Sequence, residues 1–129
     1  MNKGKIYEFD PTILPRHMYV VKGSKKFVDD NFETKDGEEI DVDYESSKAW
    51  VIEGYHKKEE RYCIIVWLGS EITAKDVAHE TYHALAAFYR EIGSELPLDK
   101  GDNGAEEMAA YLAGWIFDCI WKVRQGKVK

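Results

Sequence analysis

The chain has 129 residues, of which 44% are hydrophobic, and this is enough apolar material for one core but not for two, so we expect a single domain spanning residues 1–129. The formal net charge of −6 at pH 7 argues against a nucleic-acid partner or an anionic membrane surface, because either would require a basic face. The first ten residues lack the apolar core of a signal peptide and no stretch reaches the length of a membrane span, which predicts a cytoplasmic protein.

The N-terminal residues predict one clear strand. Residues 6–9 alternate weakly between apolar and polar side chains, and the two prolines that follow favour an extended or turning path. His17–Val21 is rich in residues that favour strands, and Gly23 and Ser24 end the segment. His17 has no companion ligand nearby, so we interpret it as a structural or exposed residue.

Residues 25–47 show no clear pattern of elements, because a few apolar side chains are scattered among acids, and we interpret the cluster of acids at positions 38–45 as a solvated loop. The acids between positions 38 and 45 could suggest a calcium site. Their spacing does not match an EF-hand loop, which needs glycine at its sixth position and glutamate at its twelfth.

Two segments rich in β-branched and aromatic residues predict a β-hairpin. They are Lys48–Gly54 and Arg61–Leu68, and the polar residues 57–60 suit the turn between them. The second segment is almost entirely apolar, which favours a position near the middle of a sheet with both faces buried. The first is more mixed and is a candidate edge strand, with Gly54 weakening its end.

Two helices are predicted in the C-terminal half. Thr73 is a suitable N-cap with Asp76 three residues later, as in a capping box, and the helical pattern then runs from Ala74 to Ile92 with Gly93 after it. A polar loop containing proline and glycine follows. The second helix is expected from about Ala105 to Val123, and it is apolar almost all round, which predicts that it is largely buried.

The first of these helices contains the pattern H-E-x-x-H. Residues four apart lie on one face of a helix, so His79 and His83 can point their imidazoles at a single ion. Glu80 lies about 100° around the helix from His79, where it can accept a proton from a metal-bound water without being a ligand. The pattern predicts the core of a zinc hydrolase. The alternative is a solvent-facing helix that carries two histidines by coincidence.

A catalytic zinc site usually has three protein ligands and one open position, so the chain should supply one more donor. In the extended pattern H-E-x-x-H-x-x-G-x-x-H, glycine and histidine follow His83, but Ala86 and Tyr89 occupy those positions here. A carboxylate is the remaining route. The candidates are Glu106 and Glu107 at the start of the second helix, and Asp99 and Asp102 in the loop before it.

The H-E-x-x-H pattern and the segment Glu107-Met108-Ala109-Ala110 together resemble the gluzincin group of zinc metallopeptidases, and most of all its small minigluzincin-like and ImmA-like members from bacteria and phages. In that group, an E-x-x-A-like segment on the following helix brings the third ligand. The resemblance therefore favours Glu107, with Glu106 as the alternative. Ala110 and Gly114 share a face with Glu107 and lack bulk, which would let the two helices approach closely. The resemblance covers roughly residues 61–118.

The resemblance implies an α+β, zincin-like fold, in which a short antiparallel or mixed sheet packs on the motif helix and on a second, C-terminal helix. It implies a zinc-dependent metallopeptidase acting on a peptide or protein, with zinc bound by His79, His83 and Glu107 and with Glu80 as general base. The alternative is a zincin-fold protein that binds zinc or a partner without hydrolysing peptides. Further residues with possible roles are Tyr82, Tyr111 and His56 as oxyanion donors, Asp118 as a partner of a ligand, and Trp50–Tyr55 as the lining of the cleft.

Overall fold

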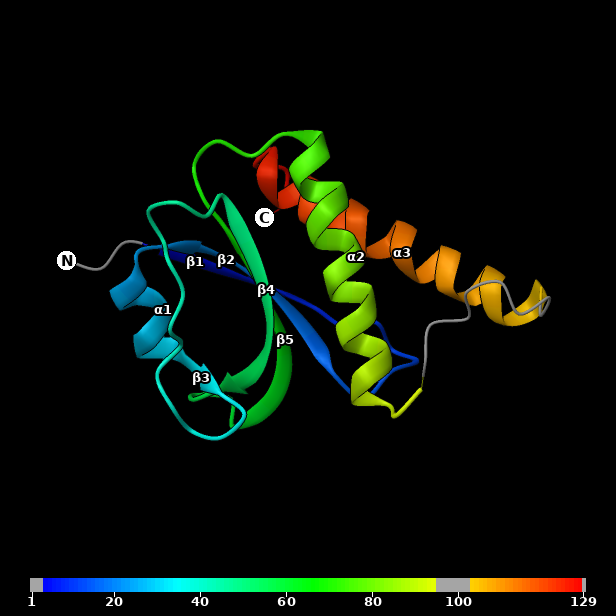
Figure 1. Ribbon diagram of the computed structural model, residues 1–129, viewed down its shortest axis with the longest axis horizontal. Helices are drawn as coiled ribbons and strands as arrows, with labels where there is room; N and C mark the ends of the chain where they lie inside the picture. The colour runs from blue at the N-terminus through cyan, green and yellow to red at the C-terminus, as the bar shows by residue number, and fades with distance from the viewer. Residues whose placement is uncertain (1–3, 95–102, 129) are drawn as a thin grey trace.

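The computed structural model describes residues 4–94 and 103–128. The elements, in chain order, are β1 (Gly4–Phe9), β2 (His17–Gly23), α1 (Lys25–Asn31), β3 (Phe32–Thr34), β4 (Ala49–His56), β5 (Arg61–Leu68), α2 (Ala74–Glu91) and α3 (Asn103–Arg124). Within the described residues, five strands form one mixed sheet, and α2 and α3 lie on one of its faces (Figure 1). The α+β class predicted from the sequence is therefore confirmed.

β5 lies in the middle of the sheet, whose strand order is β1-β2-β5-β4-β3. It pairs parallel with β2 and antiparallel with β4, and the outer pairs β1–β2 and β3–β4 are antiparallel. The predicted hairpin is confirmed, with Ala49 opposite Leu68 and His56 opposite Arg61. All residues of β5 from Cys63 onward are buried, as its continuous apolar sequence predicts.

Each face of the sheet has its own core, because successive side chains of a strand point to opposite faces. Buried side chains that pack between the sheet and the helices α2 and α3 include Met18, Ile64, Val66, Phe88, Ile116 and Ile120. Buried side chains on the other face include Tyr19, Val28, Phe32, Ile40 and Ile65. The sheet is thus covered on both sides, by two long helices on one and by α1 and the segment 35–48 on the other.

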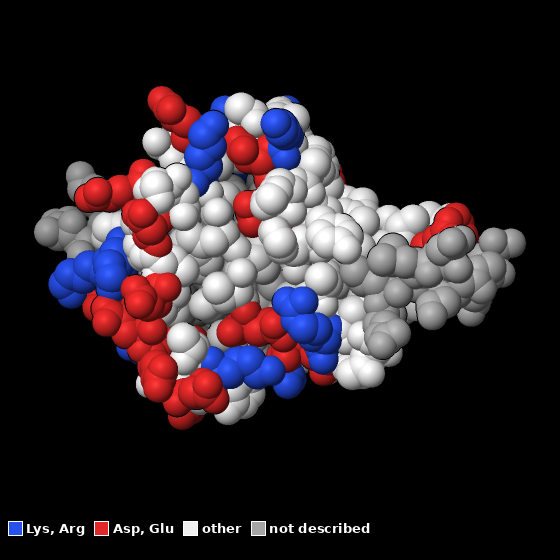
Figure 2. Space-filling view, viewed as in Figure 1, with Lys and Arg blue, Asp and Glu red and all other residues white. Residues whose placement is uncertain are grey.

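The structure contains a helix and a strand, α1 and β3, in residues 25–34, where the sequence shows no clear pattern. Ser24 caps α1 by accepting a hydrogen bond from the backbone N–H of Phe27 at 3.2 Å, and Val28 is fully buried. Ile40 is also buried, whereas the acids lie outside. Figure 2 shows acidic side chains gathered on the side of the molecule where α1 and β3 lie. A few buried apolar side chains therefore hold this acid-rich segment against the rest of the protein.

β4 is not an edge strand along its whole length, in contrast to our prediction. Its residues 54–56 pair with β3, whereas residues 49–53 pair only with β5 among the described residues. At Gly54, a Cβ atom would lie 2.7 Å from the backbone oxygen of Glu33 and 2.6 Å from Cδ1 of Ile65. This glycine therefore permits a close approach of neighbouring chain segments, and it does not mark a weak strand end.

The boundaries of α2 match the prediction. The side chain of Thr73 accepts a hydrogen bond from the backbone of Asp76, and the Asp76 carboxylate accepts one from the backbone of Thr73 at 3.0 Å, which completes the capping box. The hydrogen bond from the backbone of Thr73 lowers the pKa of Asp76, and so does a second one that the Thr73 hydroxyl donates to the same carboxylate at 2.9 Å. At the other end, Gly93 has a positive φ of 70°, the left-handed conformation that commonly terminates helices.

α3 is not buried all round. Ala109, Leu112, Ile116 and neighbouring apolar residues face the core, whereas Met108 and Tyr111 are exposed. The first turns of α3 extend beyond the sheet and α2 (Figure 1). No helix in the described part of the chain combines the length and the hydropathy needed to cross a membrane.

Candidate metal centre

His79 and His83 lie one turn apart on α2, and their rings converge. Their Nε2 atoms are 3.2 Å apart, and the ring centroids are 4.7 Å apart. Both side chains are exposed to solvent. Two nitrogens bound to one tetrahedral zinc ion at about 2.0–2.1 Å lie roughly 3.4 Å from each other. The separation of the two Nε2 atoms therefore suits a shared ion with little movement of either ring.

Glu80 differs from both histidines in its surroundings, because it is only 7% exposed. Its Oε2 lies 4.0 Å from Nε2 of His79. Burial raises the pKa of Glu80, and this effect outweighs the opposite effect of His79 and His83. A carboxylate whose pKa is raised is a stronger proton acceptor at neutral pH. The arrangement thus places a buried carboxylate beside two exposed imidazoles.

The helical period of α2 explains this contrast between neighbouring residues. Val77, Thr81 and Ala84 are buried with Glu80, whereas His79 and His83 fall on the solvent side. The motif therefore lies across the boundary between the buried and the exposed faces of the helix. The capping box at the start of α2 and the packing of its inner face fix the backbone that carries all three side chains.

The structure does not bring Glu107 to the histidine pair. Glu107 is exposed and lines a cavity of about 440 Å³ together with Pro11, Ile13 and Tyr111. Among the described residues, no group of three or more His, Cys, Asp or Glu side chains is arranged to hold a metal ion. Glu106 is exposed as well, and Asp99 and Asp102 lie outside the described residues. The identity of a third ligand stays a prediction.

The small residues that were expected to let α3 approach α2 do not lie between the helices. Ala110 and Gly114 are exposed, and a Cβ atom added at Gly114 would meet nothing within 4 Å. The core-facing side of α3 is instead formed by Ala109, Leu112 and Ile116. Glu107 shares the exposed face of α3 with Ala110 and Gly114.

Of the three candidate oxyanion donors, Tyr82 is the one that the structure places beside the motif, with its ring centroid 6.3 Å from that of His83. Tyr111 lines the same cavity as Glu107. His56 is buried on the opposite face of the sheet, where its ring packs against those of Tyr19 and Phe32. Burial lowers the pKa of His56. Its Nδ1 accepts a hydrogen bond from the backbone of Glu59 at 3.2 Å, which indicates a structural role.

Asp118, considered as a partner for a metal ligand, forms an ion pair with Lys122 at 2.8 Å on the exposed side of α3. This pair joins residues four apart on one helix, and both side chains are more than half exposed. The structure therefore does not bring Asp118 to the motif.

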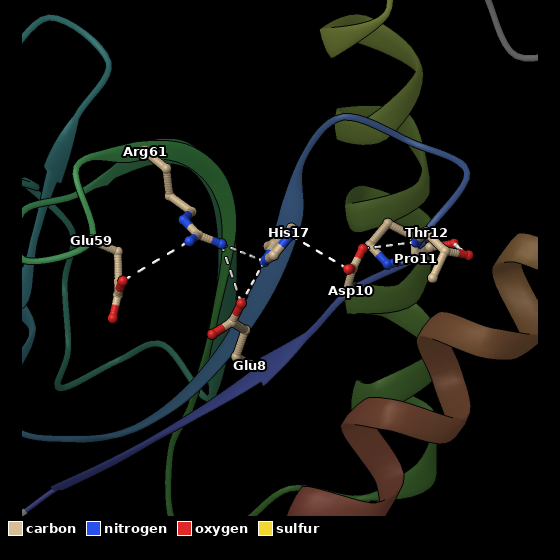
Figure 3. Close-up of polar contacts among 7 residues, drawn as sticks. All are labelled: Glu8, Asp10, Pro11, Thr12, His17, Glu59 and Arg61. Carbon is tan, nitrogen blue, oxygen red and sulfur yellow. Dashed lines mark hydrogen bonds and ion pairs between the residues drawn. The ribbon is translucent and has the colours of Figure 1, made fainter.

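His17 has partners that its sequence neighbours do not reveal (Figure 3). Its Nδ1 lies 2.5 Å from Oε2 of Glu8 and 2.7 Å from Nη1 of Arg61, and its Nε2 lies 3.7 Å from Oδ2 of Asp10. The network joins the neighbouring strands β1, β2 and β5, of which β5 is distant from the other two in the sequence. This supports the interpretation of His17 as structural.

No protein-family model, curated protein or solved structure matches the chain.

Proposed function

We propose that the protein is a zinc-dependent metallopeptidase with a zincin-like fold, acting on a peptide or protein substrate. The observation that carries the proposal is the convergence of two exposed imidazoles, with Nε2 atoms 3.2 Å apart, next to the buried carboxylate of Glu80. Imidazole nitrogen is a preferred zinc ligand, and the separation fits tetrahedral coordination. In this proposal, His79 and His83 hold the ion and Glu107 is the predicted third ligand.

Zinc, when bound, supplies a water that is acidic near neutral pH and polarises the carbonyl of the scissile bond. Glu80 takes up the proton of the attacking water at its carboxylate and then gives it to the nitrogen of the leaving amine. Its low exposure supports this role, because burial raises the affinity of the carboxylate for the proton. Tyr82 is the nearest candidate donor to a developing oxyanion.

A binding mode for the substrate is suggested by the partly unpaired strand β4. Residues 49–53 of β4 have no strand on their outer side among the described residues. An extended peptide can add to such an edge through backbone hydrogen bonds. Arg90 of α2 donates a hydrogen bond to Glu53 of β4 at 2.9 Å, which ties the motif helix to this strand. We propose that a peptide pairs with β4 alongside α2.

A second candidate function is zinc binding without hydrolysis. It is favoured by one observation: the described residues bring two ligands together but no third. A site with two protein ligands is weaker than the three-ligand sites of zinc hydrolases. In this reading, the histidine pair holds zinc for a structural or regulatory purpose.

The variant Glu80→Gln separates the two functions. In the proposed enzyme it keeps its zinc, measured by equilibrium dialysis and elemental analysis, and loses cleavage of a peptide library followed by mass spectrometry. Glu71→Gln is a matched control, because Glu71 is an exposed acid just before α2. Equal cleavage by Glu80→Gln and wild type would overturn the assignment of Glu80. Zinc binding without cleavage by the wild type would favour the second function, and absence of zinc binding would reject both.

A further inference from the structure

A cavity of about 450 Å³ lies where β2, β5 and the last turn of α3 meet. Lys22, Ser70 and Arg124 supply its polar side chains, and Gly23 and Gly69 contribute backbone. The cavity is lined by residues different from those around the histidine pair, and none of its lining residues belongs to α2. It has no part in the function proposed above.

The charged residues that line this cavity are both cations, although the chain as a whole has a net charge of −6. The side chain of Lys22 has no hydrogen-bond or ion-pair partner among the described residues. Arg124 donates from Nε to the backbone oxygen of Ile72 at 2.6 Å. This contact holds the guanidinium, and its two terminal amino groups have no hydrogen-bond or ion-pair partner within residues 4–94 and 103–128, so they can bind a ligand. The cavity therefore presents two unneutralised cations, one of which is held in place.

A neighbouring cavity of about 410 Å³ provides an internal comparison. It shares Trp67, Gly69 and Ser70 with the first, and so lies against the same loop. Its cation, Lys48, is accompanied by two acids, Glu45 and Glu71. Its lining is thus not positively charged, in contrast to that of the first cavity. An anion near this loop is expected to prefer the first cavity, because opposite charges attract it there and no carboxylate repels it.

The topology of the sheet also favours a ligand site at this position. β2 and β5 are parallel neighbours, so their carboxyl ends reach the same edge of the sheet. The chain leaves β2 through Gly23 and β5 through Gly69, and Ser70 follows on the way to α2. Loops that follow adjacent parallel strands converge outside the sheet, and ligands of α/β proteins commonly bind in the crevice between them.

We propose that this cavity binds a small oxyanion, either inorganic phosphate or the phosphate group of a monoester. Arg124 presents a planar fork of N–H donors that matches two phosphate oxygens, and Lys22 adds a second positive charge. The hydroxyl of Ser70 donates a third hydrogen bond.

The test is an NMR titration of ¹⁵N-labelled protein with inorganic phosphate, in which phosphate replaces chloride at constant ionic strength. A chelator is present throughout, so that a metal at the histidine pair cannot hold the anion. We expect saturable shifts of the backbone amides of Gly23, Gly69 and Ser70. Lys22→Gln and Arg124→Gln should each weaken binding by about five- to tenfold, because each removes a charged hydrogen-bond donor.

Lys48→Gln is the matched control, since Lys48 lines the neighbouring cavity, and it should change affinity by less than about twofold. The side chain of Lys22 has no hydrogen-bond or ion-pair partner in the described part of the chain, so its variant remains informative if Arg124→Gln is unstable. A parallel titration with glycerol 3-phosphate shows whether the cavity prefers a monoester or the free anion, because the preferred ligand binds more tightly. Shifts that do not saturate, or an affinity unchanged in Lys22→Gln, would overturn the proposal.

Discussion

Arg16 donates a hydrogen bond from Nε to Oε1 of Glu91 at 2.7 Å, and this contact ties the segment before β2 to the last turn of α2. Lys35 binds the other carboxylate oxygen of Glu91 at 2.6 Å. The Glu91 side chain is only 4% exposed. Burial raises its pKa, but the hydrogen bonds from Lys35 and Arg16 act in the opposite direction and leave the pKa of Glu91 below its ordinary value.

Stability should therefore depend on pH through Glu91. Since the pKa is lower in the folded protein, the unfolded chain takes up the proton first as the pH falls. The stabilisation is fully present above the unfolded pKa of about 4.3 and is lost as the pH falls through the folded pKa. We expect Glu91→Gln to lower the free energy of unfolding by about 1 kcal/mol at pH 7, and by much less at pH 3. Urea unfolding at both pH values measures this.

The control for this experiment is Glu59→Gln, because Glu59 is about half exposed and lies 3.9 Å from Arg61. We expect it to change the free energy of unfolding by less than about 0.5 kcal/mol at either pH. A cost of Glu91→Gln that is the same at pH 3 and pH 7 would contradict the role given to the Glu91 carboxylate.

Zinc binding should depend on both motif histidines. His79→Ala and His83→Ala each remove one of two converging nitrogens, so the dissociation constant for zinc should rise by more than about tenfold. Calorimetry or competition with a zinc indicator measures the change. His17→Ala is the control, because the partners of His17 lie in β1 and β5. An equal loss of zinc in this control would point to a different site.

The third ligand can be found by comparing four variants. We expect Glu107→Gln to weaken zinc binding by about tenfold or more, and Glu106→Gln, Asp99→Asn and Asp102→Asn to have smaller effects. Binding through Glu107 requires the first turn of α3 to approach α2, since Glu107 lines a cavity with Pro11 and Ile13 in this structure. If Glu107→Gln binds zinc as well as wild type, the variant with the largest loss identifies the ligand.

Substitution by alanine should lower the free energy of unfolding at one glycine and raise it at another. Gly54→Ala places a Cβ atom against a backbone oxygen of β3, and we expect a loss of about 1–3 kcal/mol in the free energy of unfolding. Gly114→Ala adds a methyl group to the exposed face of α3, where nothing lies within 4 Å, and we expect a gain of about 0.5–1 kcal/mol. Thermal unfolding of both variants tests the pair. Destabilisation by Gly114→Ala would mean that this face of α3 is in contact with another part of the protein.

The sequence predicted the elements that are determined by residues close together in the chain. The capping box of Thr73 and Asp76, and the glycine after α2, depend on residues a few positions apart, and both are observed. The hairpin of β4 and β5 likewise follows from two strand-like segments joined by a short polar turn. The convergence of His79 and His83 follows from the four-residue spacing on a helix.

The features that could not be predicted from the sequence also have physical explanations. α1 and β3 are short, and their few apolar residues, such as Val28 and Phe32, are separated by acids, so no periodic pattern marks them. The pairing of β4 with β3 depends on a contact at Gly54 that has no signature in composition. For α3, the helix was predicted correctly, but the face that packs against the core was not. The small residues that suggested a contact face are on the exposed side of α3.

The parallel pairing of β2 with β5 has a consequence for how the chain folds as it is synthesised. Trp67 at the end of β5 donates its indole hydrogen bond to the backbone oxygen of Gly23 at the end of β2, 44 positions earlier. Met18, Tyr19, Val20 and Val21 are four consecutive buried residues of β2, which pairs with β1 on one side and with β5 on the other. On the ribosome, the side of β2 that pairs with β5 remains open until β5 has emerged. If synthesis stalls after β2 but before β5 has emerged, the nascent chain therefore exposes the apolar strand β2, and we expect chaperones to bind it there.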